Sequence, residues 1–220
     1  MTGWGTTDPE KALAWIESNP EQFTGFNAYR PMLVGWINTD PVAATAWLQH
    51  QKLEPQQITE CVGGAMLDKI YSDGLEGASE WLASLPNQNP DMAMAARAGW
   101  LNNTRFLGNL DATQAAAAWS QVGSEPWMNP QDFQRFCTSV SASNGGSLDG
   151  FVEQLSTRWP AGKASSQFER WTAEDPSVVG ALLANMPPSK LRNAGIEGMI
   201  RQLDQTDPSL AEAWRKQLTE

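Results

Sequence analysis

The sequence has few of the residue types on which most catalytic and metal sites depend. Its 220 residues include one histidine, His50, and two cysteines, Cys61 and Cys137. A Ser-His-Asp or Cys-His site would have to use His50, and no nucleophile accompanies it in the sequence. A zinc site needs clustered His and Cys ligands, whereas these three residues are scattered. We therefore expect no catalytic residue, no metal and no cofactor, a solvated His50 at a helix end, and two free buried thiols.

Long apolar runs and basic clusters are also missing. No stretch approaches the roughly 20 apolar residues that cross a bilayer, and the N-terminus has no basic region followed by an apolar one. The 15 lysines and arginines form no run, and the net charge is −10. Because phosphate binding needs a basic surface, we expect no nucleic-acid partner. We also expect no membrane insertion by this segment.

Tryptophan, by contrast, is abundant, with eleven tryptophans against two tyrosines. Most belong to a recurring motif, clearest where Trp36 precedes Asp40-Pro41 by four residues and Ala44 and Trp47 follow Asp40. An aspartate can cap the first turn of a helix, and proline fits the first helical position while holding the residue before it out of the α region. Ala44 and Trp47 then lie on one helical face. The motif predicts a helix end, a turn and a new helix with a small residue and a buried indole.

Variants of the motif recur along the whole chain. The predicted cap residues stand 31 to 38 positions apart, at Asp8, Asp40, Asp73, Asp111, Asn144, Asp175 and Asp207. A period near 32 with helical periodicity inside it is typical of helix–turn–helix repeats. The second helices are predicted over 21–37, 56–71, 90–108, 130–142, 161–173 and 188–204, after proline-bearing breaks. No strand alternation is present.

The predicted fold is all-α, an α-solenoid of about seven helix–turn–helix repeats of ~32 residues. We expect about thirteen helices in antiparallel pairs that stack into a superhelix. The array should occupy residues 1–220 as a single domain. Because Trp4 stands where a second helix would end, we expect the chain to be the C-terminal part of a longer protein.

The string Trp-x3-Asp-Pro-x2-Ala-x2-Trp resembles a functionally uncharacterised family of bacterial helical-repeat proteins abundant in Verrucomicrobia. Residues 4–15 and 36–47 match in full, 171–182 and 203–214 in part, 73–81 and 111–119 with a shift of one residue, and 144–151 weakly. The resemblance implies a broadly tetratricopeptide-like fold and a place in the cell envelope or periplasm, but no activity. The tetratricopeptide consensus itself, with its Gly-Tyr and Ala-Phe signature, is not met.

These features favour a non-enzymatic interaction or scaffold module that binds another protein or peptide on a curved helical surface. Two alternatives stay open: a structural spacer within a larger envelope protein, and a ligand-binding or enzyme toroid whose carboxylates act on a sugar or peptide. Carboxylates clustered on the concave side would favour the toroid, and a surface without apolar or repeat-breaking patches would favour the spacer. Residues that break the repeat are the candidates for partner binding: Tyr29, Arg30, Arg97, Asn102, Asn103, Arg105, Trp127 and Arg135.

Overall fold

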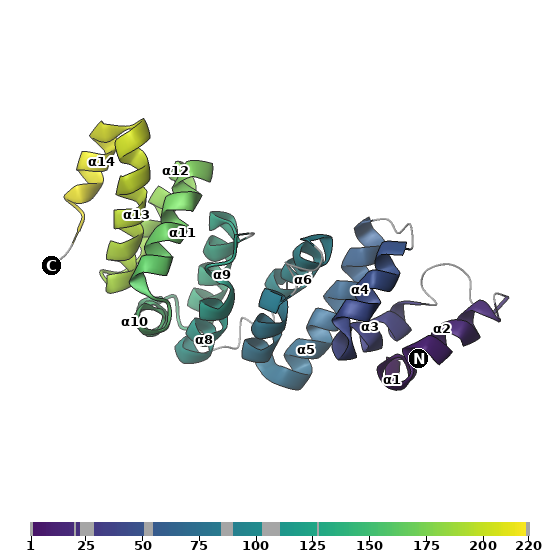
Figure 1. Cartoon of the computed structure of the whole chain (residues 1–220). Coiled ribbons are helices and arrows are strands. Elements are labelled where there is room, and N and C mark those ends of the chain that lie inside the picture. The colour runs from purple at the N-terminus through teal and green to yellow at the C-terminus, as the bar shows by residue number, and fades with distance from the viewer. Residues whose placement is uncertain are drawn as a thin grey trace. The chain divides into compact units, whose positions relative to one another are not determined.

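The computed structural model describes residues 2–19, 21–22, 29–50, 55–84, 90–102, 111–126 and 128–218. Over these ranges every regular element is a helix and no strand is present (Figure 1). The predicted all-α fold is therefore confirmed. The helices group into two compact units, Met1–Asn103 and Thr104–Glu220. The single domain predicted over 1–220 stays a prediction.

In the first unit, α1 packs against α3, α3 packs against α5, and α5 packs against α6. Its elements are α1 (Thr2–Thr7), α2 (Pro9–Glu17), α3 (Arg30–Thr39), α4 (Pro41–His50), α5 (Pro55–Ser84) and α6 (Pro90–Asn102). The helix predicted over 21–37 begins too early, because residues 21–22 form a turn and α3 starts at Arg30. The helix predicted over 90–108 starts at Pro90 as expected, and residues 103–108 lie outside the described part.

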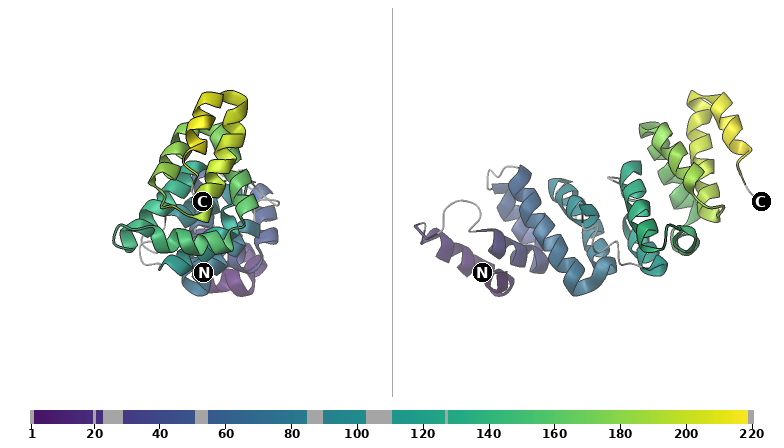
Figure 2. Two further views of the ribbon diagram at one scale, coloured as in Figure 1. Left: turned by 90° about the vertical axis from the view of Figure 1, so that its left-hand side faces the viewer. Right: turned by 180° about the vertical axis from the view of Figure 1, so that it is seen from behind.

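In the second unit, α8 packs against α10 and α11 packs against α13. The rear view of Figure 2 shows the green α11 and the yellow-green α13 side by side. The elements are α8 (Ala112–Val122), α9 (Pro130–Ser143), α10 (Asp149–Arg158), α11 (Ala161–Glu174), α12 (Pro176–Asn185), α13 (Lys190–Thr206) and α14 (Pro208–Arg215). The helices predicted over 130–142, 161–173 and 188–204 correspond to α9, α11 and α13 within two residues at each end.

The four Asp-Pro joints between helices share one backbone geometry. Each aspartate has φ between −142° and −155° and ψ between 74° and 87°: Asp8, Asp40, Asp175 and Asp207. Its N–H donates to the carbonyl oxygen four residues earlier, at 2.7–2.8 Å. Its carboxylate accepts from the N–H three residues later, at 3.0–3.2 Å. The proline excludes the aspartate from the α region, so one helix ends and the next begins across a single residue.

The small residue of the motif is more deeply buried than the tryptophan that comes after it. Ala12 and Ala44 are fully buried, whereas Trp15 is 38% exposed and Trp47 is half-buried. The prediction that the indole at this position lies in the core is therefore wrong for Trp15. Its ring instead packs across the joint on that of Trp4, at 5.6 Å between centroids, and Trp47 packs likewise on Trp36 at 6.3 Å. Trp36, which is itself buried, thus packs across its turn.

Three predicted caps have no proline after them: Asp111 caps α8 as expected, whereas Asp73 and Asn144 do not behave as simple caps. The helix is interrupted at the predicted place, next to Asp73. The residue that interrupts it is Gly74, which has φ 73° and ψ 178° inside the span of α5. The carboxylate of Asp73 forms an ion pair with Lys69 at 2.9 Å. The cap predicted at Asn144 is wrong, because this residue ends α9 and α10 begins only at Asp149. The glycines after Asn144 take left-handed conformations, which terminate helices rather than start them.

Helices of the predicted second type pack on one another through small residues. A Cβ atom on Gly198 of α13 would collide with the carbonyl oxygen of Ser165 in α11. A Cβ atom on Gly99 of α6 would lie 2.9 Å from the Cα of Gly63 in α5. Glycine at these positions therefore lets the helix backbones approach closely.

Candidate functional site

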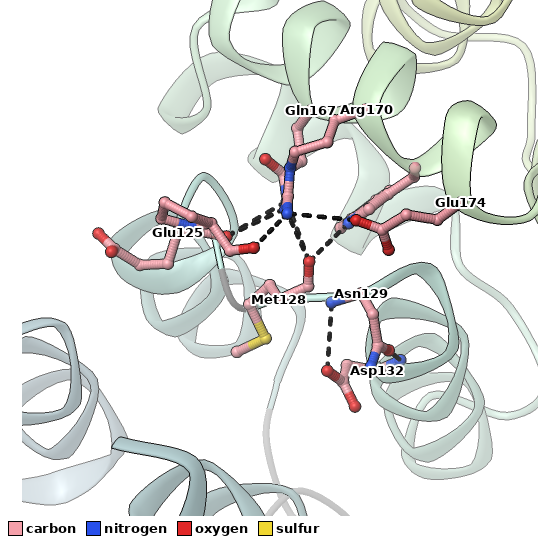
Figure 3. Close-up of polar contacts among 9 residues, drawn as sticks. Glu125, Met128, Asn129, Asp132, Gln167, Arg170 and Glu174 are labelled. Carbon is pink, nitrogen blue, oxygen red and sulfur yellow. Dashed lines mark hydrogen bonds and ion pairs between the residues drawn. The ribbon is translucent and has the colours of Figure 1, made fainter. Parts of the chain in front are cut away.

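The most elaborate polar cluster of the described residues surrounds the segment 123–129, which joins α8 to α9. Three side chains of α11 reach across to this segment and bind its backbone (Figure 3). All three, Gln167, Arg170 and Trp171, come from successive turns of α11, so one helical face supplies every donor. We call these three residues the α11 clamp.

The clamp binds main-chain carbonyl groups. The guanidinium of Arg170 donates to the carbonyl oxygens of Pro126, of Glu125 at 3.2 Å and of Met128 at 2.8 Å. The amide of Gln167 donates to the Glu125 and Met128 oxygens at 3.4 and 3.3 Å, and the indole of Trp171 donates to the Met128 oxygen at 2.8 Å. The bonds of Gln167 and Trp171 to the Met128 oxygen are buried, so they satisfy a carbonyl group that is shielded from water.

Further side-chain contacts hold both ends of the segment. The indole N–H of Trp159 donates to the hydroxyl of Ser124 at 2.6 Å. At the other end, Asn129 caps α9, and Asp132 completes a capping box by accepting from the Asn129 N–H at 3.2 Å. The segment is thus fixed along its described length, because side chains bind its residues 124, 125, 126, 128 and 129.

A groove of about 750 Å³ lies beside the clamp. It is lined by Ser124, Glu125, Pro126, Gly162, Lys163, Ser166, Gln167 and Arg170. Burial raises the pKa of the Glu125 carboxyl, and the nearby charge of Lys163 opposes this rise. Arg170 also faces Glu174 at 3.4 Å. The groove therefore offers hydroxyl, ammonium and amide groups beside a partly desolvated carboxylate.

The clamp was not among the residues selected from the sequence. Arg170 stands five residues before Asp175, where the other Asp-Pro joints have Gly3, Gly35 and Gln202. It therefore breaks the repeat, and the criterion that selected the other candidates could have found it. The bonds to residues 125–128 could not be found this way, since they join positions about forty residues apart.

The residues selected from the sequence lie elsewhere. Tyr29 precedes α3 and its ring lies 5.8 Å from that of Trp47, while the adjacent Arg30 is exposed. In α6, Arg97 is half-buried and Asn102 is exposed. Arg135 is exposed on α9 of the second unit. Three of the candidates fall outside the described residues: Asn103, Arg105 and Trp127. None of the described candidates lines the groove.

The thiols of Cys61 and Cys137 are free and buried, as predicted. Burial raises the pKa of Cys61 to about 12 and also raises the pKa of Cys137. Such thiols are poor nucleophiles, because the thiolate is the reactive form. Within the described ranges no three His, Cys, Asp or Glu side chains gather as metal ligands would. No helix in those ranges is long and apolar enough to cross a bilayer.

Comparisons with protein-family models, with curated proteins and with solved structures found no match to this chain.

Proposed function

We propose that the protein is a non-enzymatic interaction or scaffold module that binds an extended segment of another protein. Its architecture would be a tetratricopeptide-like α-solenoid of about seven repeats of ~32 residues, with antiparallel helix pairs stacked into a superhelix. The shared geometry of the four Asp-Pro joints supports the repeat. The same motif underlies the proposed relation to the bacterial helical-repeat family and, through it, a place in the cell envelope or periplasm.

The α11 clamp is the observation on which the binding proposal rests. Its donors hold the carbonyl groups of a non-helical segment of the same chain, so we infer that side chains on this helix can also bind the backbone of an extended partner segment. Main-chain contacts of this kind supply affinity without requiring a particular sequence, and neighbouring pockets supply specificity.

The groove beside the clamp would bind a partner segment through side chains of α11 that the clamp does not use. Lys163 is exposed and Ser166 lies one turn further along α11, so the groove presents an ammonium group and a hydroxyl group. We therefore propose an extended segment with an acidic side chain as the occupant, whose carboxylate would pair with Lys163. The charge of Glu125 would oppose occupants with several acidic residues at this position.

The proposal can be tested by selecting peptides from a phage-displayed random library against the intact chain. Selected peptides should contain an acidic residue, and Lys163→Glu should weaken their binding by about tenfold, or ~1.4 kcal/mol. The matched control is Lys216→Glu, which reverses another exposed lysine of the same unit and should leave binding unchanged. Circular dichroism of both variants verifies that the helices are retained.

Failure to select any peptide, or peptides whose binding is insensitive to Lys163→Glu, would contradict this site. Arg135→Glu tests the candidates chosen from the sequence in the same assay. If it weakens binding whereas Lys163→Glu does not, the partner surface lies on α9. If no peptide binds any form of the chain, the structural spacer becomes the better proposal.

A further inference from the structure

The turn between α9 and α10 contains the only Asn-Gly pair of the sequence, Asn144-Gly145. Gly145 and Gly146 have φ values of 65° and 89°, in the left-handed region that glycine adopts without strain. Both glycines are exposed, and Asn144 is half-buried. The asparagine therefore ends a helix and precedes two residues with unusual backbone freedom.

Hydrogen bonds hold the turn on either side of the Gly145 amide. The N–H of Gly146 donates to the Ser141 oxygen at 2.8 Å, and the N–H of Ser147 donates to the Asn144 oxygen at 3.2 Å. Among the described residues, the N–H of Gly145 donates no hydrogen bond to another backbone group. This nitrogen has no side chain beside it and is adjacent to the side-chain amide of Asn144.

We propose that Asn144 is a site of spontaneous covalent modification by deamidation. The backbone nitrogen of Gly145 attacks Cγ of Asn144 and forms a C–N bond. The bond from Cγ to Nδ2 breaks, and Nδ2 departs as ammonia with the former amide proton of Gly145. The resulting five-membered succinimide then takes up one water molecule. Its ring opens at either carbonyl group, giving aspartate or isoaspartate at position 144.

The structure supplies a matched comparison residue in Asn185. Both asparagines lie at the end of a helix, and both donate from Nδ2 to the carbonyl oxygen four residues earlier at 2.8 Å, Asn144 to Val140 and Asn185 to Ala181. They differ in the next residue of the chain, because Asn185 precedes Met186. The methionine side chain hinders attack by its own backbone nitrogen, and its backbone has less freedom than that of glycine.

Deamidation would weaken the end of α9. A neutral amide that donates to the Val140 oxygen would be replaced by a carboxylate, which cannot donate and which lies at the negative end of the helix dipole. Isoaspartate would additionally insert one methylene into the backbone between α9 and α10. Ser141 and Leu148, on either side of this turn, line a cavity of about 270 Å³ that also includes Cys137.

The test is to hold the full folded chain at neutral and mildly alkaline pH, digest it at intervals, and quantify deamidated peptides and isoaspartate by mass spectrometry. Asn144 should deamidate several-fold faster than Asn185, and its rate should rise with pH because the attacking nitrogen must lose its proton. Equal rates at the two asparagines would overturn the proposal. So would a reaction of Asn144 that occurs in urea but not in the folded chain.

Discussion

Arg192 is an almost fully buried cation, 8% exposed, that binds the ends of two other helices. Its Nε donates to the Leu183 oxygen near the end of α12, at 2.9 Å. Its two terminal nitrogens donate to the backbone and side-chain oxygens of Gln217, just beyond α14, at 3.0 and 3.2 Å. The C-terminal end of a helix has a partial negative charge, so the guanidinium is stabilised by both ends.

Replacing this side chain should cost substantial stability. Arg192→Leu leaves the buried carbonyl group of Leu183 and the part-buried one of Gln217 without their donor, and we expect the free energy of unfolding to fall by about 2–4 kcal/mol. Equilibrium unfolding in urea measures the loss. The control Arg135→Leu changes an exposed arginine of the same unit and should alter stability by less than about 0.5 kcal/mol. Equal effects would contradict the proposed importance of the Arg192 contacts.

The cap at Asp175 should make stability depend on pH. Its pKa is lowered by the hydrogen bond from the Ser177 hydroxyl, at 2.7 Å, and by the backbone N–H of Val178. Because the pKa in the folded state lies below the unfolded value of about 3.9, this contribution is complete above that value and disappears as pH falls through the lowered pKa. Thermal unfolding should show wild type and Asp175→Asn converging in stability at low pH. Ser177→Ala should reduce the difference between them at neutral pH, and a pH-independent difference would contradict this account.

At the scale of single residues, the sequence predicted local contacts and missed distant ones. The caps at Asp8, Asp40, Asp111, Asp175 and Asp207 could be predicted because a cap and its acceptor lie within one helical turn. The long-range contacts of Arg170 and Arg192 could not be predicted, since the oxygens of Pro126 and Gln217 lie 44 and 25 residues away along the chain.

Between helices, the packing of α11 on α13 depends on the absence of a side chain at Gly198. A Cβ there would meet the Ser165 oxygen and lie 2.9 Å from the Glu169 nitrogen, both of which belong to a helix backbone that cannot move aside cheaply. We expect Gly198→Ala to destabilise the chain by about 1–3 kcal/mol, as measured by urea unfolding. Gly162→Ala is the control, because its Cβ would meet no atom within 4 Å. That change should be neutral or stabilise by up to about 1 kcal/mol.

Several helix starts were predicted well from the proline that marks them, but the start of α3, which also has a proline in its first turn, was not. Pro130, Pro176 and Pro208 all occupy first-turn positions of described helices. The glycines that allow close packing gave no comparable signal, because a glycine inside a helix can equally reflect an open surface, as at Gly162. For the same reason the candidate groove was not predicted: its residues come from two segments that only tertiary packing brings together.

At the scale of the whole molecule, the two units differ in how completely their aromatic side chains are buried. In the second unit Trp119, Trp159 and Trp171 are at most 1% exposed and contact one another through an aromatic cluster with Phe133. Trp214 of that unit is half-buried. In the first unit Trp36 and Trp100 are buried, but Trp15 is 38% exposed and three further tryptophans are only half-buried: Trp4, Trp47 and Trp81. Since buried aromatic area is a large part of core stability, the second unit should be the more stable.

Each unit contains one buried thiol, so chemical labelling can measure the opening of each unit separately. Cys61 in the first unit and Cys137 in the second should react with a thiol reagent only when their surroundings open, because burial raises the pKa of both. In single-cysteine variants, we expect Cys61 to become reactive at a lower urea concentration than Cys137. Identical urea midpoints would instead indicate that both units unfold together, as the predicted single domain would.

The kink at Gly74 has a consequence for exchanging segments between positions of the chain. The Asp-Pro joints need φ near −65° at the proline, whereas Gly74 has φ 73°, which proline cannot adopt. A segment cut at Gly74 therefore could not replace a segment that begins at an Asp-Pro joint without changing the path of the backbone. The segments from Asp8 to Asp40 and from Asp175 to Asp207 have the same joint geometry at both ends, so we expect that one can replace the other without changing the path of the backbone at either joint.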